Sequence, residues 1–287
     1  MTRFSDRLAL ALVDGARAEL ELTPKPGLVD RLDNGSHPDL SFEAMGRSIA
    51  LLPLYFDALL DIARRAPALD LAACVQAGVD AEARMAATIG SNAHRGYIFL
   101  GGLVLLGATE FERRGQLATV AALRAAIRGV ASRVLGSPVP RPSAGPTSNG
   151  AAVRQRHALG GIHREALEGL PSVFDVGLPV CADRLKTAHP SPRAAATGAA
   201  TQARHYLMAV LMQSVEDTTA VHRCGPAGLA RLRTDGARLQ HIIEQQADYQ
   251  PYLRALNDEY RAMRLTMGGV ADCLAICLAL HEVELAR

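Results

Sequence analysis

Residues 96–109 read GYIFLGGLVLLGAT, 14 residues that form the longest uncharged stretch of the chain. A helix needs about 20 apolar residues to cross a bilayer, so this stretch is too short to span one. Its length and composition are instead typical of a helix buried inside a protein. We therefore expect an apolar helix over residues 96–111.

Apolar residues recur at helical spacing on both sides of this segment, whereas strands that alternate apolar and polar residues are missing. The sequence thus predicts an all-α fold, a single compact multi-helix domain over residues 1–287 with functional loops at the helix ends. Ser, Asp and Pro mark the helix starts. The expected helices are one through Leu8, Leu12, Ala16 and Leu20 with Ser5 as its cap, one after Ser41 with a kink at Pro53, one capped by Asp70, one over 117–135, one from Ser191-Pro192 to about 213, one from Pro226 to about 246, a shorter one from Pro251, and one over 269–284.

The composition excludes several classes of protein. Of the 287 residues, 49% are apolar and 21% are charged, which is typical of a globular protein and not of a disordered one. Lys and Arg number 31 against 29 Asp and Glu, so the net charge of +2 lacks the basic excess of a nucleic-acid-binding protein. The apolar run at residues 8–13 is too short for the core of a signal peptide. We expect a soluble protein that binds neither nucleic acid nor membrane.

The cysteines give the expected compartment. There are five of them, an odd number, and no CxxC motif occurs. Neither a disulfide framework nor a zinc ribbon is therefore indicated. Cys273 and Cys277 lie four residues apart in an expected buried helix, where we expect them to pack as small apolar side chains. The sequence predicts a cytoplasmic protein.

Polar and glycine-rich clusters lie between the expected helices. In the first cluster, residues 23–30 read TPKPGLVD and residues 34–39 read NGSHPD. Two prolines restrict the backbone around Lys25, whose ammonium is suited to bind phosphate. Asp30 and Asp39 are suited to bind Mg²⁺. The alternative is a polar interhelix loop with solvated charges.

The second and third clusters also combine glycine with charged groups. Glu82 precedes GSNAHRG at residues 90–96, which opens an apolar helix where backbone N–H groups are free to bind an anion, and where a capped turn is the alternative. TSNG at residues 147–150 is followed by GGIHREA at residues 160–166. Here Glu165 beside Arg164 is either a general acid or base or half of a surface ion pair.

The last two clusters flank long expected helices. Residues 216–225 read EDTTAVHRCG and suit contact with a metal ion or phosphate, although a helix cap explains Asp217 equally well. Residues 266–272 read TMGGVAD, where two glycines permit an anion to approach and Asp272 lies in a first helical turn. We expect packed helices to bring these ends together around one pocket, and we expect the proline-rich segment 136–150 to form a lid over it.

These motifs, in this order, resemble the triphosphoribosyl-dephospho-CoA synthase family, the ATP:dephospho-CoA triphosphoribosyltransferases. The resemblance covers about residues 15–282, and TPKPGLVD is its most specific part. It implies an all-helical enzyme that removes adenine from ATP and joins the ribose C1 to the 2′-hydroxyl of 3′-dephospho-CoA, with Mg²⁺ as cofactor. The product is the precursor of the prosthetic group on an acyl-carrier subunit, which we expect to belong to malonate decarboxylase in preference to citrate lyase.

The chain departs from the family pattern at single positions. It has Asn92-Ala93-His94 where NTH is expected, and Asp217-Thr218-Thr219 where DTN is expected. Cys224 stands in a glycine position, and Met267 replaces a proline. Because polar residues are retained beside each change, the departures affect the roles expected for the altered positions more than the activity expected for the whole chain.

The resemblance and the residue types together define the expected site. Loss of adenine develops positive charge at C1, which a nearby carboxylate stabilises. Asp272 is a further candidate for this carboxylate, and the sequence does not rank the candidates. We expect catalytic carboxylates among Asp30, Glu82, Glu165 and Asp217; Mg²⁺ ligands among Asp30, Asp39, Asp217 and Asp272; and substrate contacts from Lys25, Ser36, His37, Asn92, His94, Arg95, Arg164, His222, Arg223, Gly268 and Gly269.

Two other functions remain open at this point, and a homodimer is also possible. One is a Mg²⁺-dependent N-glycosidic hydrolase of a nucleotide or ADP-ribosyl substrate, which would use water in place of the CoA hydroxyl. The other is a non-catalytic helical scaffold. A scaffold would present a contiguous apolar face, whereas the clusters of this chain are polar and rich in glycine.

Overall fold

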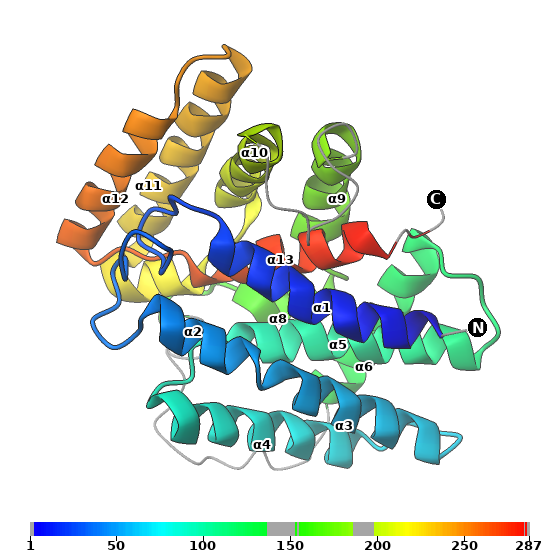
Figure 1. The fold of residues 1–287 in the computed structure, drawn as a ribbon. Helices are drawn as coiled ribbons and strands as arrows, with labels where there is room; N and C mark the ends of the chain where they lie inside the picture. Colours follow the sequence, from blue (N-terminus) through cyan, green and yellow to red (C-terminus); the bar gives the residue numbers. More distant parts are fainter. Residues whose placement is uncertain (1–2, 137–152, 154, 186–197, 284, 286–287) are drawn as a thin grey trace.

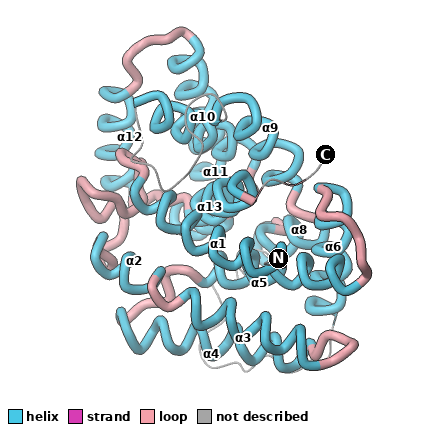
Figure 2. The backbone as a smooth tube through the Cα atoms, turned by 45° about the vertical axis from the view of Figure 1, so that its right-hand side comes forward, coloured by secondary structure: helices cyan, strands magenta, loops and turns pink. Residues whose placement is uncertain are grey.

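The computed structural model describes residues 3–136, 153, 155–185, 198–283 and 285. Within these ranges the chain is helical and contains no strand or sheet, as predicted (Figure 2). The helices are α1 (Phe4–Glu21), α2 (Phe42–Ile49), α3 (Leu52–Arg65), α4 (Leu71–Ile89), α5 (Arg95–Arg113), α6 (Val120–Gly136), α8 (Gly161–Leu167), α9 (Leu178–Val180), α10 (Gly198–Ser214), α11 (Thr218–Glu244), α12 (Gln250–Met263) and α13 (Gly268–Glu282), with π-helical turns η1 (Ser172–Gly177) and η2 (Cys181–Leu185).

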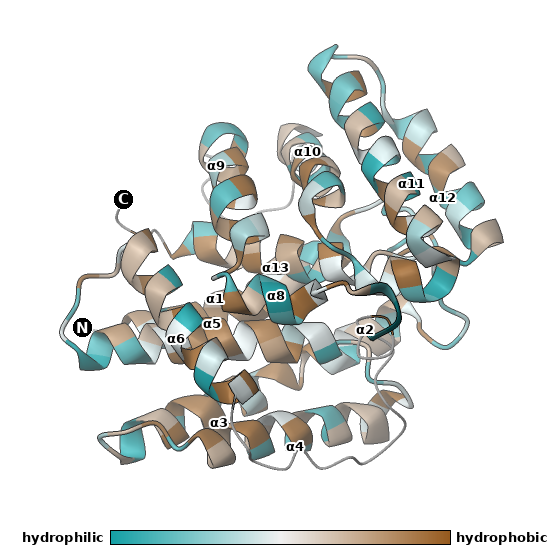
Figure 3. Ribbon diagram, turned by 180° about the vertical axis from the view of Figure 1, so that it is seen from behind, coloured by the Kyte–Doolittle hydropathy of each residue, from teal (hydrophilic) through white to brown (hydrophobic). Residues whose placement is uncertain are grey.

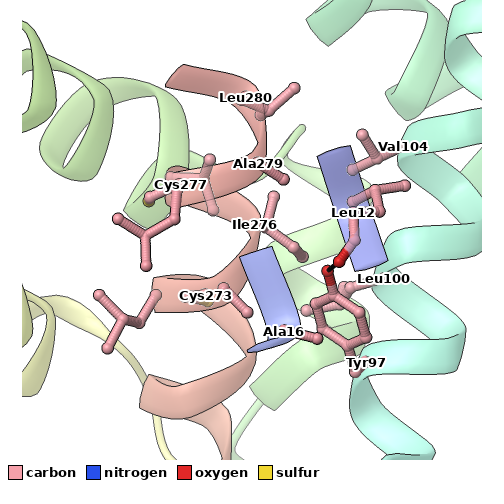
Figure 4. Close-up of a cluster of buried hydrophobic side chains, with 14 of the residues drawn as sticks. Leu12, Ala16, Tyr97, Leu100, Val104, Cys273, Ile276, Cys277, Ala279 and Leu280 are labelled. Atoms are coloured by element: carbon pink, nitrogen blue, oxygen red, sulfur yellow. Dashed lines mark hydrogen bonds between the residues drawn. The ribbon is translucent and has the colours of Figure 1, made fainter. Parts of the chain in front are cut away.

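Three helices form the centre of the molecule. α1 packs along α13, and α5 contacts both of them (Figure 1). The close approach of α1 to α13 requires Gly15, because a Cβ there would lie 2.3 Å from the carbonyl oxygen of Ala275. Figure 4 shows side chains of all three helices meeting in the core, where the Tyr97 hydroxyl donates to the carbonyl oxygen of Leu12 at 2.5 Å.

The other helices surround this centre. α3 packs against α4 and α5, and α6 lies along α5. α10 pairs with α11, and α11 and α12 form a hairpin that projects from the body in Figure 1. In Figure 3, α5 is mostly hydrophobic, whereas α11 and α12 alternate hydrophobic and hydrophilic residues along their length. This pattern agrees with a buried α5 and a half-exposed hairpin.

One large apolar cluster runs through these helices and forms the core. Leu100, Val104 and Leu105 of the apolar helix predicted over residues 96–111 are fully buried. Cys273 and Cys277 are buried as well, as expected. The described cysteines are all free thiols. None of the described helices is long and apolar enough to cross a membrane.

Two predicted helix starts were wrong. Ser5 does not cap α1, which begins one residue earlier; its backbone N–H and hydroxyl instead donate to the Glu112 carboxylate at 2.8 and 2.7 Å. Pro53 does not kink a helix, because α2 has ended at Ile49 and Pro53 lies in the first turn of α3. Proline is tolerated there because the first N–H groups of a helix have no intrahelical acceptor.

The other helix boundaries follow the predictions closely. The Ser41 hydroxyl accepts from Ala44 N at 3.2 Å and caps α2, and the Asp70 carboxylate accepts from Ala73 N at 3.0 Å and caps α4. Pro226 opens the second half of α11 as predicted, because Gly225, with φ 68° and ψ −172°, breaks the helix directly before it. The expected start at 191–192 lies outside the described residues, as does segment 137–150 of the expected lid. The π-helical turns were not predicted.

Candidate functional site

A pocket lies where α1, α2, α5 and α13 meet the loop between α1 and α2. It encloses about 550 Å³, its open mouth included. Its apolar walls include Leu28, Leu40 and Met45. Its polar lining residues are Glu19, Lys25, His37, His94 and Asp272. Four of the five sequence clusters contribute to or lie directly behind this pocket, so the expected convergence of helix ends is present.

The TPKPGLVD loop is held in place by hydrogen bonds from distant helices. The fully buried His205 on α10 contacts the Pro24 carbonyl oxygen through Nε2 at 3.0 Å, and the Tyr249 hydroxyl lies 3.2 Å from its Nδ1. Asn257 on α12 accepts from Gly27 N at 3.0 Å. The Ser36 hydroxyl, which we expected to contact substrate, donates to the carbonyl oxygen of Leu265 at 2.6 Å. The loop is therefore fixed from α10 and α12.

Asp30 has a local partner for each carboxylate oxygen. Its oxygens accept from Lys25 N at 2.7 Å, from Leu32 N at 2.7 Å and from Asp33 N at 3.3 Å. The side chain is 4% exposed and does not line the pocket. Asp30 thus shapes the loop, and the structure does not bring it to the other predicted metal ligands.

Lys25 is buried in an ion pair that the sequence analysis did not anticipate. Only 1% of the side chain is exposed, and its Nζ donates to the Glu19 carbonyl oxygen at 2.7 Å and to Glu19 Oε1 at 2.5 Å. A pair removed from water in this way is held by its geometry and hydrogen bonds. Lys25 therefore lines the pocket wall with two of its three protons already donated.

The sequence analysis missed Glu19, although a signal for it was present. Glu19 follows Leu12 by seven residues and Ala16 by three, so it lies on the apolar face of α1. A carboxylate on such a face needs a partner or a function, because an unpaired buried charge is costly. Ser48, which contacts His94, was also missed, and no sequence pattern marks it as a site residue.

His94 opens α5 and is 6% exposed. Its Nδ1 lies 2.7 Å from the Ser48 hydroxyl oxygen. Burial, together with the charge of Lys25, lowers the pKa of His94 to about 4. The imidazole is therefore neutral near pH 7 and presents an uncharged ring to the pocket.

His37 lies near the open side of the pocket, where its Nε2 contacts the Thr266 hydroxyl at 2.9 Å. Burial and the nearby Arg223 guanidinium lower the pKa of His37, and Asp39 raises it. Arg223 and Asp39 are themselves exposed. The mouth of the pocket thus combines a cation, a carboxylate and a neutral imidazole.

Asp217 ties the start of α11 to the start of α13. Its carboxylate accepts from Thr219 N at 2.9 Å, from Ala220 N at 3.0 Å, from the Thr219 hydroxyl, and across the interface from Val270 N at 3.0 Å. Burial raises the pKa of Asp217, against the effect of these hydrogen bonds. A Cβ on Gly269 would lie 3.1 Å from Asp217 Oδ2, so the glycine permits this close packing.

Asp272, one turn further along α13, is different. It lines the pocket, and no hydrogen bond or ion pair joins it to any described residue. Its carboxylate lies over the first turn of α5, where a Cβ on Gly96 would be 2.0 Å from Asp272 Oδ2. Burial, followed by the nearby Asp217 and Glu19, raises the pKa of Asp272 well above its usual value. Neither oxygen accepts a hydrogen bond from the described residues.

The predicted residues Glu82, Asn92 and Arg95 lie outside the pocket lining. Glu82 on α4 accepts from Asn92 Nδ2 at 2.9 Å and has Arg95 Nε at 3.4 Å. Burial raises the pKa of Glu82, and Arg95 lowers it. Asn92 Oδ1 is buried without a hydrogen-bond partner. This group forms a second polar cluster directly before His94.

The third sequence cluster makes structural contacts. Glu165 accepts from Ser172 N at 2.8 Å and from the Ser172 hydroxyl at 3.0 Å, at the start of η1. Arg164 pairs with Glu168 at 2.8 Å and with Glu216 at 3.6 Å.

The glycines expected to admit a ligand, at 160 and 161, both donate their N–H groups to the Glu216 carboxylate, at 2.8 and 3.0 Å. His222 is exposed on α11, and residues 147–150 lie outside the described part of the chain. The pocket includes Gly268 from the fifth cluster.

No group of three or more His, Cys, Asp or Glu side chains is arranged to hold a metal ion among the described residues. The predicted metal ligands are spread over four places. Asp272 is in the pocket, Asp217 lies behind it, Asp39 is near its mouth, and Asp30 is within the loop.

Comparisons with known proteins identify the family. A sequence profile described as ATP:dephospho-CoA triphosphoribosyl transferase matches residues 5–287. Proteins named "probable 2-(5''-triphosphoribosyl)-3'-dephosphocoenzyme-A synthase" are similar over nearly the full chain. The one from Pseudomonas paraeruginosa is 34% identical over 97% of this chain and 91% of its own. The one from Azotobacter vinelandii is 36% identical over 98% and 91%, and the one from Pseudomonas putida is 33% identical over 97% and 95%.

No solved structure matches the chain. The range that the profile matches, residues 5–287, includes the residues that line the pocket. The chain belongs to the ATP:dephospho-CoA triphosphoribosyl transferase family.

Proposed function

We propose that this chain transfers the triphosphoribosyl unit of ATP to the 2′-hydroxyl of 3′-dephospho-CoA and releases adenine. The names of its relatives support this activity, and the pocket between α1, α5 and α13 is the site we propose for it. The observation that carries the assignment of the site is Asp272, a carboxylate that faces the pocket without a partner among the described residues.

The chemistry of the transfer needs such a group. The bond from C1 of the ribose to adenine breaks with its electron pair leaving on adenine, and positive charge develops at C1. A carboxylate beside C1 stabilises this charge and then accepts the proton of the 2′-hydroxyl as the new bond from carbon to oxygen forms. We propose Asp272 for these two tasks, because it lines the pocket and its carboxylate has no hydrogen-bond donor among the described residues.

The surroundings of Asp272 fit this role. α13 begins at hydrogen bonds to Asp217 and Thr219, so the backbone that carries Asp272 is fixed. The apolar side chains of Leu28, Leu40 and Met45 line the same pocket. They help to keep water from C1, which is needed because water would otherwise hydrolyse ATP.

We assign the triphosphate to the mouth of the pocket, where Arg223 is exposed beside His37. A guanidinium binds phosphate through two parallel N–H groups. Lys25, which we had expected to bind phosphate, has two protons committed to Glu19 and forms part of the wall.

Mg²⁺ remains part of the proposal. This ion is usually held by one or two carboxylates together with substrate phosphates, so a site with few protein ligands fits it. Asp39 is exposed near Arg223 and His37, where the triphosphate is placed. When bound with ATP, Mg²⁺ would neutralise phosphate charge.

The test measures adenine release by the purified chain with ATP and Mg²⁺, with and without dephospho-CoA, and identifies the product by mass spectrometry. We expect release to depend on dephospho-CoA. Asp272→Asn should lower kcat by about 100-fold or more, because a positioned acid or base contributes about 10²–10⁴. Asp57→Asn is the control, since Asp57 is exposed on α3.

Two results would contradict the proposal. Adenine release that ignores dephospho-CoA would indicate an N-glycosidic hydrolase. Full activity of Asp272→Asn would remove the pocket as the site.

We further propose that the product supplies the acyl-carrier subunit of a malonate decarboxylase, and that the enzyme acts in the cytoplasm. The neighbouring genes test the first point: a cluster that encodes citrate lyase subunits would contradict it. Light scattering of the purified chain distinguishes a monomer from the homodimer that the sequence analysis left possible.

A further inference from the structure

The contact between Ser48 and His94 fixes which imidazole nitrogen carries the proton. The Ser48 hydroxyl oxygen lies 2.9 Å from the Met45 carbonyl oxygen and 2.7 Å from His94 Nδ1. A carbonyl can only accept, and a hydroxyl has one proton. The assignment that satisfies both contacts sends the hydroxyl proton to Met45 and lets Nδ1–H donate to Ser48. His94 Nε2 therefore carries a lone pair.

This lone pair is available to a ligand in the pocket. His94 is 6% exposed and lines the pocket, and among the described residues the only hydrogen bond of its imidazole ring is the one to Ser48. Its ring also packs edge-on to Tyr97, with centroids 6.3 Å apart. The ring is neutral near pH 7, since its pKa is about 4. The ring lacks a second hydrogen-bond partner among the described residues, so a ligand in the pocket that supplies a donor gains a hydrogen bond there.

Lys25 adds a donor to the same wall. An ammonium has three protons, and Glu19 accepts two of them through its carbonyl and carboxylate oxygens. The third is left for the pocket that Lys25 and His94 both line. The two groups are close enough for the charge of Lys25 to act on His94. The wall thus presents an acceptor and a donor together.

Purine bases differ in how they match this pair. Adenine carries a 6-amino donor beside a ring nitrogen that accepts, whereas a 6-oxo purine has two acceptors, O6 and N7, side by side. Leu28, Met45 and Ala93 supply apolar surface in the same pocket, suited to the faces of a base. A 6-oxo group would place a lone pair against the lone pair of His94 Nε2.

We infer that His94 and Lys25 read the edge of the adenine of ATP, with His94 Nε2 accepting from the 6-amino group and Lys25 Nζ donating to the neighbouring ring nitrogen. His94 is then a specificity-determining residue, and the hydrogen bond from Lys25 assists the departure of adenine. This inference rests on the proposed function, because it places the leaving base of the transferred nucleotide on this wall.

The test compares ATP with ITP and with purine riboside triphosphate, which lacks the 6-amino group, at constant dephospho-CoA. The wild type should prefer ATP by about tenfold or more in kcat/KM, as expected when a buried polar group is left unmatched. His94→Ala should reduce this preference to near unity. A purely structural role of His94 would instead lower the rates with all three nucleotides equally.

Two further variants keep the result interpretable. Ser48→Ala removes the acceptor of His94 Nδ1–H and should weaken the preference for ATP while activity remains measurable. If His94→Ala does not fold, this variant still tests the role of His94. His241→Ala, an exposed histidine on α11, should retain the full preference. Equilibrium binding of the three nucleotides should follow the same order as kcat/KM.

The outcomes separate the two proposals. Absence of transfer from ATP by the wild type would overturn the proposed function. Transfer from ATP with a preference that His94→Ala and Ser48→Ala leave unchanged would overturn the reading of adenine by His94, and leave the proposed function intact.

Discussion

At the scale of single residues, the buried ion pair of Lys25 and Glu19 predicts how strongly the stability of the fold depends on each partner. Removing one member leaves the other buried and uncompensated, which typically costs 3–5 kcal/mol. We expect Lys25→Met to lower the free energy of unfolding by about that amount. Urea denaturation measures the change.

The double variant Lys25→Met with Glu19→Gln should recover most of this stability, because no unpaired charge remains. Its transferase activity should stay low, since the pocket has lost its donor. Equal stability of the single and double variants would contradict a coupled pair. The position of Lys25 between two prolines was used in the prediction, whereas its partner Glu19 was missed although its place on an apolar helix face could be read from the sequence.

At the scale of elements, Asp217 connects two helix starts. Asp217→Ala leaves the N–H groups of Ala220 and Val270 without acceptors in a buried interface, and we expect a loss of about 3 kcal/mol or more in unfolding free energy. The matched control is Asp70→Ala, which removes an exposed cap with one hydrogen bond and should cost about 1 kcal/mol. Urea denaturation of both variants measures the difference.

A small change in stability with a complete loss of activity would instead make Asp217 a catalytic residue, as the sequence predicts. The sequence left this choice open because a capping aspartate and a catalytic aspartate look alike in a single chain. The decisive facts are the contact with Val270 and the packing of Gly269, and both involve residues about 50 positions away.

At the scale of the whole molecule, the sequence predicted the helices well and the site in part. Helix spacing and end residues are local signals, which is why Ser41 and Asp70 were correctly identified as caps. The motif order predicted that Lys25, His94 and Asp272 converge, and they do. The sequence also placed Glu165 among the site residues, but Glu165 binds Ser172 instead. Ser172 begins a π-helical turn that the sequence did not predict.

The stability of the whole fold should also depend on pH through His205. Burial lowers the pKa of His205 to about 4, from 6.5 as the usual value. Between these values the unfolded chain binds more protons than the folded one, so the free energy of unfolding rises with pH across this window and is lost on acidification. From pH 7 to pH 5 the contribution of this one group is a loss of about 2 kcal/mol.

His205→Gln cannot be protonated in this range. The variant should be less stable than the wild type at pH 7, because His205 contacts Pro24 and Tyr249, but its further loss between pH 7 and pH 5 should be smaller by about 2 kcal/mol. Urea denaturation at both pH values measures the difference, with His241→Gln as the exposed control. Parallel losses in wild type and His205→Gln would show that His205 is not the group that acidification charges, and would move the acid sensitivity to another buried group such as His94.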